Sequence, residues 1–179
     1  MEQLREGLWW WTGTHPDWTP DDGGPDGWGA EVSSYAFDCG GVFVLVDPIS
    51  PPSVIDELAE GRRVAVGLTS EWHGRSTGEV VARLGASVGP MDGCVEVKAS
   101  LDGDHVLWIP AYGALVFGDL LIAEPGELRI PDAWLNTKDG ETHESRAQGL
   151  RHLLELPVEH ALPTHGRPST RADLERALA

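Results

Sequence analysis

The feature that most constrains the fold of this chain is a set of four apolar segments that each end on polar side chains. Each has the continuous apolar character of a buried strand and is followed by a turn or a helix start. We therefore expect Asp47, the 69–77 loop, Asp119 and His165 to converge on one edge of the protein, where functional side chains usually lie. The four segments are VFVLVDP at 42–48, LTSEWHGRST at 68–77, LWIPAYGALVFGDLL at 107–121 and LPTHGRP at 162–168.

The order of the predicted elements indicates the fold class. Apolar or alternating runs predict strands, and amphipathic runs that end at glycine predict helices. Strands come first in a meander and later alternate with helices, an order that suits two sheets packed on each other with helices outside. Predicted strands cover 7–12, 31–38, 42–47, 63–68, 94–98, 105–109, 114–118 and 158–162, and predicted helices cover 53–60, 76–85, 142–155 and a C-terminal segment.

Local signals mark two helix starts and one long loop. Ser76 with Glu79, and Thr170 with Asp173, have the spacing of a capping box, in which two side chains close the first helical turn. Residues 14–29 are rich in tryptophan, proline, glycine and aspartate, which predicts an irregular loop. Since this loop carries tryptophan, we expect it to pack over another part of the protein.

Composition indicates a globular protein and narrows its partners. The 179 residues are 41% hydrophobic and fit one domain over 1–179. A formal net charge of −16 repels phosphates, so we expect no nucleic-acid partner and no membrane surface. The sequence has no apolar run long enough to span a membrane and no signal peptide. Cys39 and Cys94 show no metal-ligand spacing, so we expect buried, reduced thiols and a cytoplasmic location.

In their order and spacing, the four segments resemble the metallo-β-lactamase fold superfamily. The resemblance covers about residues 31–178 and implies an α+β fold of the four-layer αββα sandwich type. It also implies one or two metal ions, usually zinc, whose bound water attacks a carbonyl or phosphoryl centre. The family's ligands come from a His-x-His-x-Asp-His loop after a strand, a further histidine, an aspartate after a glycine and a late histidine.

The 69–77 loop departs from this ligand pattern. If Thr69 opens the motif, the ligand places hold Ser70, Trp72, Gly74 and Arg75. A shift of one residue instead places His73 at a histidine, Arg75 at the aspartate and Ser76 at the last histidine. Both registers remain open, and both put an arginine where a metal ligand belongs.

Elsewhere the ligand set is incomplete as well. Ser100 stands near the place of the further histidine, and only Asp119 and His165 match ligand places cleanly. Two zinc ions need about six to eight protein donors, so we expect no dinuclear zinc site and no bound cofactor. The alternative is one zinc or other divalent ion held by Asp119, His165 and His73.

The candidate site residues fall into two groups. His73, Arg75, Asp119 and His165 are the candidate catalytic residues of the cleft. His15, Trp18 and Trp72 are candidate binding residues, whereas Trp9 to Trp11 are assigned to the core and Asp47 to a strand-end turn. Because a buried Asp119 needs a partner, we expect Arg75 to pair with it, directly or through one water, in place of the missing cation.

Three functions are compatible with these residues. The preferred hypothesis is a protein without the dinuclear site that binds a small molecule or a partner in the remnant cleft. The alternative is a hydrolase of the ester, thioester or lactam class with a single metal ion. The third is a metal-free enzyme with His73 or His165 as general base and Arg75 stabilising an anion.

Overall fold

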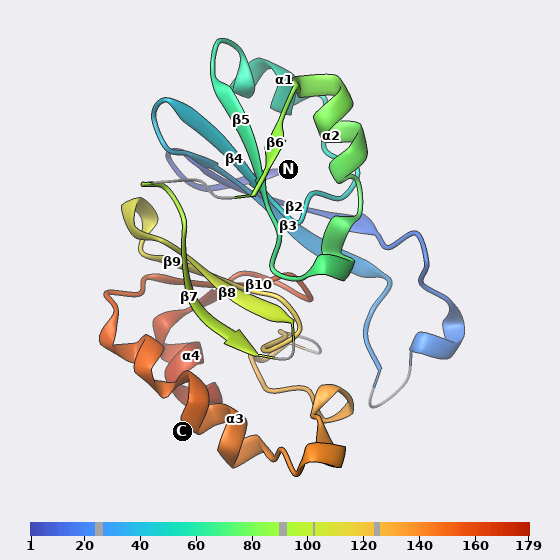
Figure 1. The fold of residues 1–179 in the computed structure, drawn as a ribbon, viewed down its shortest axis with the longest axis vertical. Helices are drawn as coiled ribbons and strands as arrows, with labels where there is room; N and C mark the ends of the chain where they lie inside the picture. Colours follow the sequence, from blue (N-terminus) through green and yellow to red (C-terminus); the bar gives the residue numbers. More distant parts are fainter. Residues whose placement is uncertain (24–26, 90–92, 102, 124–125) are drawn as a thin grey trace.

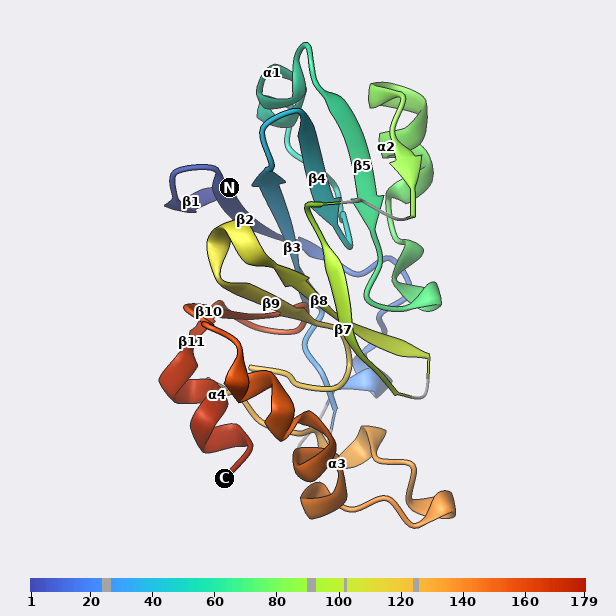
Figure 2. The same ribbon diagram turned by 60° about the vertical axis from the view of Figure 1, so that its left-hand side comes forward.

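Two β-sheets pack face to face between two layers of helices, as Figure 1 and Figure 2 show from two directions. The computed structural model describes residues 1–23, 27–89, 93–101, 103–123 and 126–179. The α+β class and the αββα sandwich expected from the sequence are confirmed.

The first sheet has six strands in the order β1-β2-β3-β4-β5-β6. The strands from β1 to β4 are antiparallel neighbours, while β4, β5 and β6 run parallel and are connected through α1 and α2. The bounds are β1 (Glu2–Arg5), β2 (Leu8–Thr14), β3 (Glu31–Asp38), β4 (Val42–Val46), α1 (Val54–Ala59), β5 (Arg63–Gly67), α2 (Thr77–Leu84) and β6 (Ser87–Val88).

The second sheet has five strands in the order β11-β10-β9-β8-β7. Only β9 and β10 pair in parallel, and α3 lies on the connection between them. The bounds are β7 (Glu96–Leu101), β8 (Asp104–Ile109), β9 (Ala114–Phe117), α3 (His143–Leu150), β10 (His160–Pro163), β11 (Ser169–Thr170) and α4 (Arg171–Ala177).

Three buried clusters correspond to the three interfaces between the four layers. The middle cluster joins the sheets, the second joins the six-stranded sheet to α1 and α2, and the third joins the five-stranded sheet to α3 and α4. Strand β4 contributes to two of these clusters. Val44 faces the other sheet, and Phe43 and Leu45 face the helices, so both faces of the strand are buried and the whole strand is apolar.

Several local predictions need correction. β1 was not predicted, and the expected 142–155 helix becomes a 3₁₀ segment, η6 (Arg151–Glu155), after α3. Thr170 and Asp173 form the predicted capping box. Ser76 does not cap α2, because its hydroxyl accepts a hydrogen bond from Ser50 N at 3.0 Å instead.

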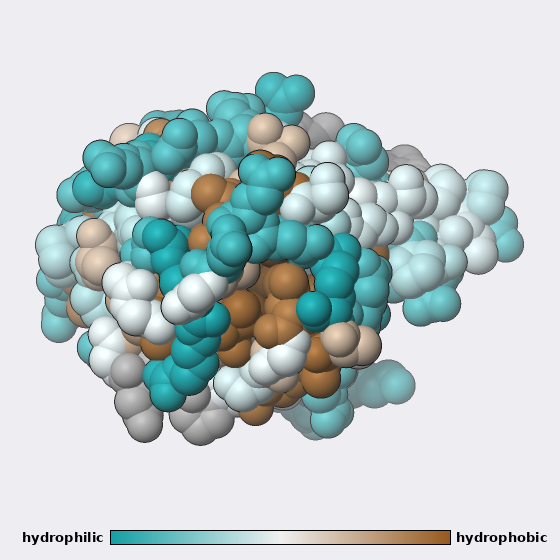
Figure 3. Space-filling model, turned by 90° about the horizontal axis from the view of Figure 1, so that it is seen from above, coloured by the Kyte–Doolittle hydropathy of each residue, from teal (hydrophilic) through white to brown (hydrophobic). Residues whose placement is uncertain are grey.

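Hydrophobic side chains also reach the surface. Figure 3 views the end at which α1 and α2 lie in Figure 1, and hydrophobic residues gather near its centre among hydrophilic ones. On the edge strands β6 and β7, Val88 and Val97 are more than half exposed.

Within the described ranges, every helix is too short or too polar to cross a membrane.

Candidate metal centre

Three side chains from separate segments converge at one edge of the sandwich. His73, Asp119 and His165 each offer one ligand atom, and the three atoms lie within 4.8 Å of one another. Asp119 Oδ1 is 3.2 Å from His73 Nε2 and 3.3 Å from His165 Nε2. Both imidazoles are buried, and the Asp119 side chain is 21% exposed. We call these three residues the triad.

The ends of two neighbouring strands position two members of the triad. Asp119 follows β9 and His165 follows β10, and the parallel pairing of these strands brings their carboxyl ends side by side. A backbone hydrogen bond from Ala123 N to His165 O, 2.8 Å long, fixes the two following loops to each other. His73 reaches the same edge from the other sheet, on the 3₁₀ turn η2 (Glu71–Gly74) after β5.

Asp47 orients the ring of His73. Its carboxylate is buried at the end of β4, and Oδ2 lies 2.9 Å from His73 Nδ1. Thr69 donates to the same carboxylate from its backbone N, at 2.9 Å from Oδ1, and from its hydroxyl to Oδ2. With Nδ1 bonded to the carboxylate, Nε2 faces Asp119, which is the arrangement in which a histidine presents a nitrogen to a metal. Asp47 therefore does more than close a turn.

The triad is electrostatically coupled. Burial alone lowers the pKa of His73, but the attraction of Asp47 and hydrogen bonds to Asp119 and Asp47 raise this pKa to about 9. For Asp119, burial favours the neutral acid, yet the hydrogen bonds to His165 and His73 hold its pKa well below the usual range. Burial lowers the pKa of His165. These shifts favour the proton on His73 and the ionised form of Asp119.

Arg75 lies beside the triad without pairing with it. The guanidinium Nη1 donates to the carbonyl oxygens of Ser33, at 2.9 Å, and Asp47, at 3.2 Å. Among the described residues no ion pair joins Arg75 to Asp119, so the direct form of the expected pair is wrong, and a pair through one water stays a prediction. Both histidines lie next to Asp119 Oδ1 instead. Asp47 and Arg75 both have positive φ, at 44° and 37°, a strained backbone region that is common near functional sites.

Indole rings surround the triad. Trp28 and Trp134 each contact His165 edge-on, with ring centroids 5.1 Å away. Trp72 Nε1 donates to Asp119 Oδ2 at 3.0 Å. Sequence reasoning missed the contacts of Trp28 and Trp134, although the tryptophan content of the 14–29 loop already indicated packing over another part of the protein.

The other candidate binding residues reach the site indirectly. His15 contacts the ring of Trp28 at 5.1 Å, and Trp18 Nε1 donates to Trp28 O at 3.0 Å. Both residues therefore support Trp28. Ser100 donates to or accepts from His105 Nδ1 at 2.8 Å on β7 and takes no part in the triad.

A buried carboxylate lies behind Asp119. Asp104 is 6% exposed, and its Oδ1 accepts from Asp119 N at 3.4 Å. Burial, followed by the charge of Asp119, raises the pKa of Asp104 to about 7. No sequence pattern had singled this residue out, because its burial depends on the pairing of β8 with distant segments.

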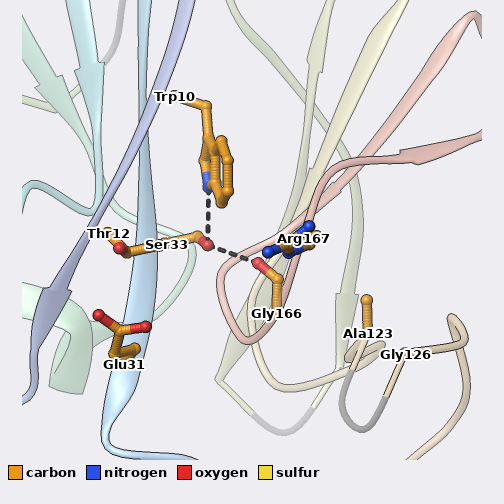
Figure 4. A pocket seen from close by; sticks show the side chains of 8 residues that line it. All are labelled: Trp10, Thr12, Glu31, Ser33, Ala123, Gly126, Gly166 and Arg167. Carbon is orange, nitrogen blue, oxygen red and sulfur yellow. Dashed lines mark hydrogen bonds between the residues drawn. The ribbon is translucent and has the colours of Figure 1, made fainter. Parts of the chain in front are cut away.

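A cavity of about 340 Å³ adjoins the loop of His165 (Figure 4). Gly166, the next residue, lines it together with Trp10 and Ser33. Trp10 Nε1 donates to Ser33 Oγ at 2.9 Å, and this hydroxyl donates to Gly166 O. Trp10 lines this cavity and also packs against the middle cluster, while Trp11 is buried in the core as expected.

The triad has the donor set and the spacing of a single metal site. Tetrahedral ligands at the usual zinc distances are about 3.3 Å from one another. Asp119 Oδ1 lies at this spacing from both Nε2 atoms and is buried between them. Of the two sequence registers, only the one that puts His73 at a histidine place supplies a ligand from this loop. The described residues offer no second cluster of this kind.

Comparisons with known proteins identify the fold. No family model and no curated protein sequence matches the chain. Among solved structures, VMB-1 is similar with a TM-score of 0.66 and 12% identity, covering 99% of this chain and 93% of that one. A metallo-β-lactamase from Hirschia baltica has a TM-score of 0.62 and 16% identity, with 99% and 94% covered. The DIM-1 metallo-β-lactamase has a TM-score of 0.60 and 17% identity, with 99% and 93% covered.

Proposed function

We propose that this chain, which has the metallo-β-lactamase fold, binds one divalent metal ion at His73, Asp119 and His165 and is a metal-dependent hydrolase. The observation that carries the proposal is the position of Asp119 Oδ1, buried between two imidazole nitrogens at 3.2 and 3.3 Å. Two nitrogens and one carboxylate oxygen form a ligand set that occurs in catalytic zinc sites, where a further coordination place is open.

The chemistry that such an ion supplies is Lewis acidity, which polarises a carbonyl or phosphoryl oxygen. The protein contributes the orientation of the ligands. Asp47 and Thr69 fix the imidazole of His73, and the rings of Trp28 and Trp134 pack edge-on against His165. Such supporting contacts maintain ligand geometry and basicity.

For the substrate, we propose a small molecule with an ester, thioester or lactam bond. The support is twofold: solved structures of this fold carry the name metallo-β-lactamase, and Gly166, the residue after His165, lines a cavity of about 340 Å³. The net charge of −16 favours a small molecule over nucleic acid as the partner.

The first experiment is elemental analysis of protein purified without chelator. We expect about one zinc per chain, removed by chelation and restored by added zinc. His165→Ala should abolish retention of the metal, whereas His160→Ala, at the opposite end of β10, is the matched control and should retain it. Two zinc ions per chain, lost together on chelation, would establish a dinuclear site instead.

Activity is then measured on a panel of one chromogenic ester, thioester and β-lactam. Metal-loaded wild type should hydrolyse at least one of them, and chelated wild type and His165→Ala should not. A metal-loaded protein inactive on the whole panel would favour binding without turnover.

A metal-free function is the second candidate, and one observation favours it. The raised pKa of His73, to about 9, makes its imidazolium a built-in counter-charge for Asp119 at neutral pH. In this case His73, not Arg75, replaces the cation. Wild-type protein that contains no metal yet hydrolyses a panel substrate after exhaustive chelation would select this alternative.

A further inference from the structure

We infer that Trp72 is a positioning residue that restricts Asp119 to ligation through a single oxygen. This inference rests on the proposed metal site and concerns a residue outside the ligand set. Its basis is a division of the two carboxylate oxygens of Asp119. Oδ1 faces both histidines, at 3.2 and 3.3 Å, while Oδ2 accepts the indole N–H of Trp72 at 3.0 Å.

The chemistry of indole explains why the two oxygens of Asp119 have different partners. An indole nitrogen donates one hydrogen bond and accepts none, so Trp72 cannot ligate a metal. Its hydrogen bond occupies Oδ2 and sets the rotation of the carboxylate, which leaves Oδ1 directed at the histidines. A carboxylate that bridged two ions, or bound one ion through both oxygens, would have to rotate against this bond or share Oδ2 with it.

Trp72 is not held in place by burial in the core. Its side chain is 49% exposed. Its ring lies against the turn between β7 and β8, where a Cβ on Gly103 would come within 2.9 Å of the ring. Gly103 has a φ of +89°, so glycine allows the backbone of the turn and also leaves room for the ring of Trp72. Contacts at Asp119 and Gly103 thus fix an indole that packing alone would leave mobile.

The test compares Trp72→Phe, which keeps an aromatic ring and loses the N–H, with Trp72→Gln, which loses the ring and keeps a donor. Zinc affinity is measured by competition with a chromogenic chelator. We expect a loss of about 10–100-fold for Trp72→Phe, typical for removal of a contact that orients a ligand, and an affinity closer to wild type for Trp72→Gln.

Cobalt substitution supplies a readout that packing would not move. Four-coordinate Co²⁺ absorbs visible light more strongly than Co²⁺ with five or six ligands. If Trp72 restricts Asp119 to one oxygen, the visible absorption of the Co²⁺ protein should weaken in Trp72→Phe, as the freed carboxylate adds its second oxygen, and recover in Trp72→Gln.

The matched control is Trp134→Phe. Trp134 also lies against a triad histidine but donates no described hydrogen bond to a triad side chain. Equal losses of affinity in Trp134→Phe and Trp72→Phe, or wild-type affinity and spectrum in Trp72→Phe, would overturn the inference while the metal site stands. Wild-type protein that binds no zinc would overturn the metal site and the inference together.

Discussion

His73 Nδ1 lies 2.9 Å from Asp47 Oδ2, although the two residues are 26 positions apart. The contact joins the end of β4 to the turn after β5, two strands that pair in parallel. It decides which nitrogen of His73 faces the triad, and so it links the stability of the sheet edge to the chemistry of the site.

Replacing Asp47 by asparagine should therefore affect both properties. The amide keeps the shape but cannot accept all the donors of Thr69 and His73, so we expect a loss of about 1–3 kcal/mol in the free energy of unfolding. Zinc affinity should fall by about 10–100-fold. Denaturant unfolding of metal-free protein and zinc competition measure the two effects. Asp56→Asn, which removes a half-exposed carboxylate paired with Arg83, is the control for loss of a charge.

A double-mutant cycle on Arg75→Met and Asp119→Asn tests the assignment of the counter-charge. Because Arg75 donates to backbone carbonyls and both histidines lie next to Asp119, the coupling energy between the two changes in metal-free stability should stay below about 1 kcal/mol. A larger coupling energy would mean that the two charges interact directly in solution.

The buried ion pair of Arg146 and Glu141 should contribute strongly to the stability of the Trp134 segment. Arg146 Nε and Nη2 bind the two Glu141 oxygens at 2.8 and 2.7 Å, and Nη2 also donates to Trp134 O at 2.8 Å. Arg146→Met should leave the carboxylate of Glu141, 13% exposed, unpaired and cost about 1–3 kcal/mol. Adding Glu141→Gln should recover part of that loss in chemical denaturation. A loss below about 1 kcal/mol in the free energy of unfolding, typical of an exposed ion pair, would show that water solvates Glu141 when Arg146 is removed.

Cys39 should be unreactive in the native protein. Burial, then a hydrogen bond with Cys94, raises the pKa of its thiol to about 12. The thiolate, which is the reactive form, is then roughly one molecule in ten thousand at pH 8. Alkylation followed by mass spectrometry should be slow, increase about tenfold per pH unit and become fast in urea. Modification of native protein at the rate of an unfolded thiol would contradict this.

Much of the architecture could be predicted because its signals are local. The continuous apolar run of β4, buried on both faces, and the strand ends at Asp119 and His165 identify a sandwich without any knowledge of distant contacts. The Thr170 capping box is equally local, since donor and acceptor lie within one turn. Ser76 has the same pattern, yet its hydroxyl accepts a hydrogen bond from the backbone N of Ser50, which lies 26 residues away in the sequence.

The sequence by itself determined the two packed sheets, the helices outside them, and the presence of Asp119 and His165 at strand ends. Only the tertiary structure decided that His73 completes the triad, that Arg75 pairs with carbonyl oxygens, and that Trp72 binds the second oxygen of Asp119. The physical reason is that strand periodicity fixes the faces of a sheet, whereas the direction of a loop side chain depends on backbone angles. At Arg75 a φ of 37° sets that direction, and the carbonyl oxygens of Ser33 and Asp47, both at the edge of the six-stranded sheet, hold the guanidinium there.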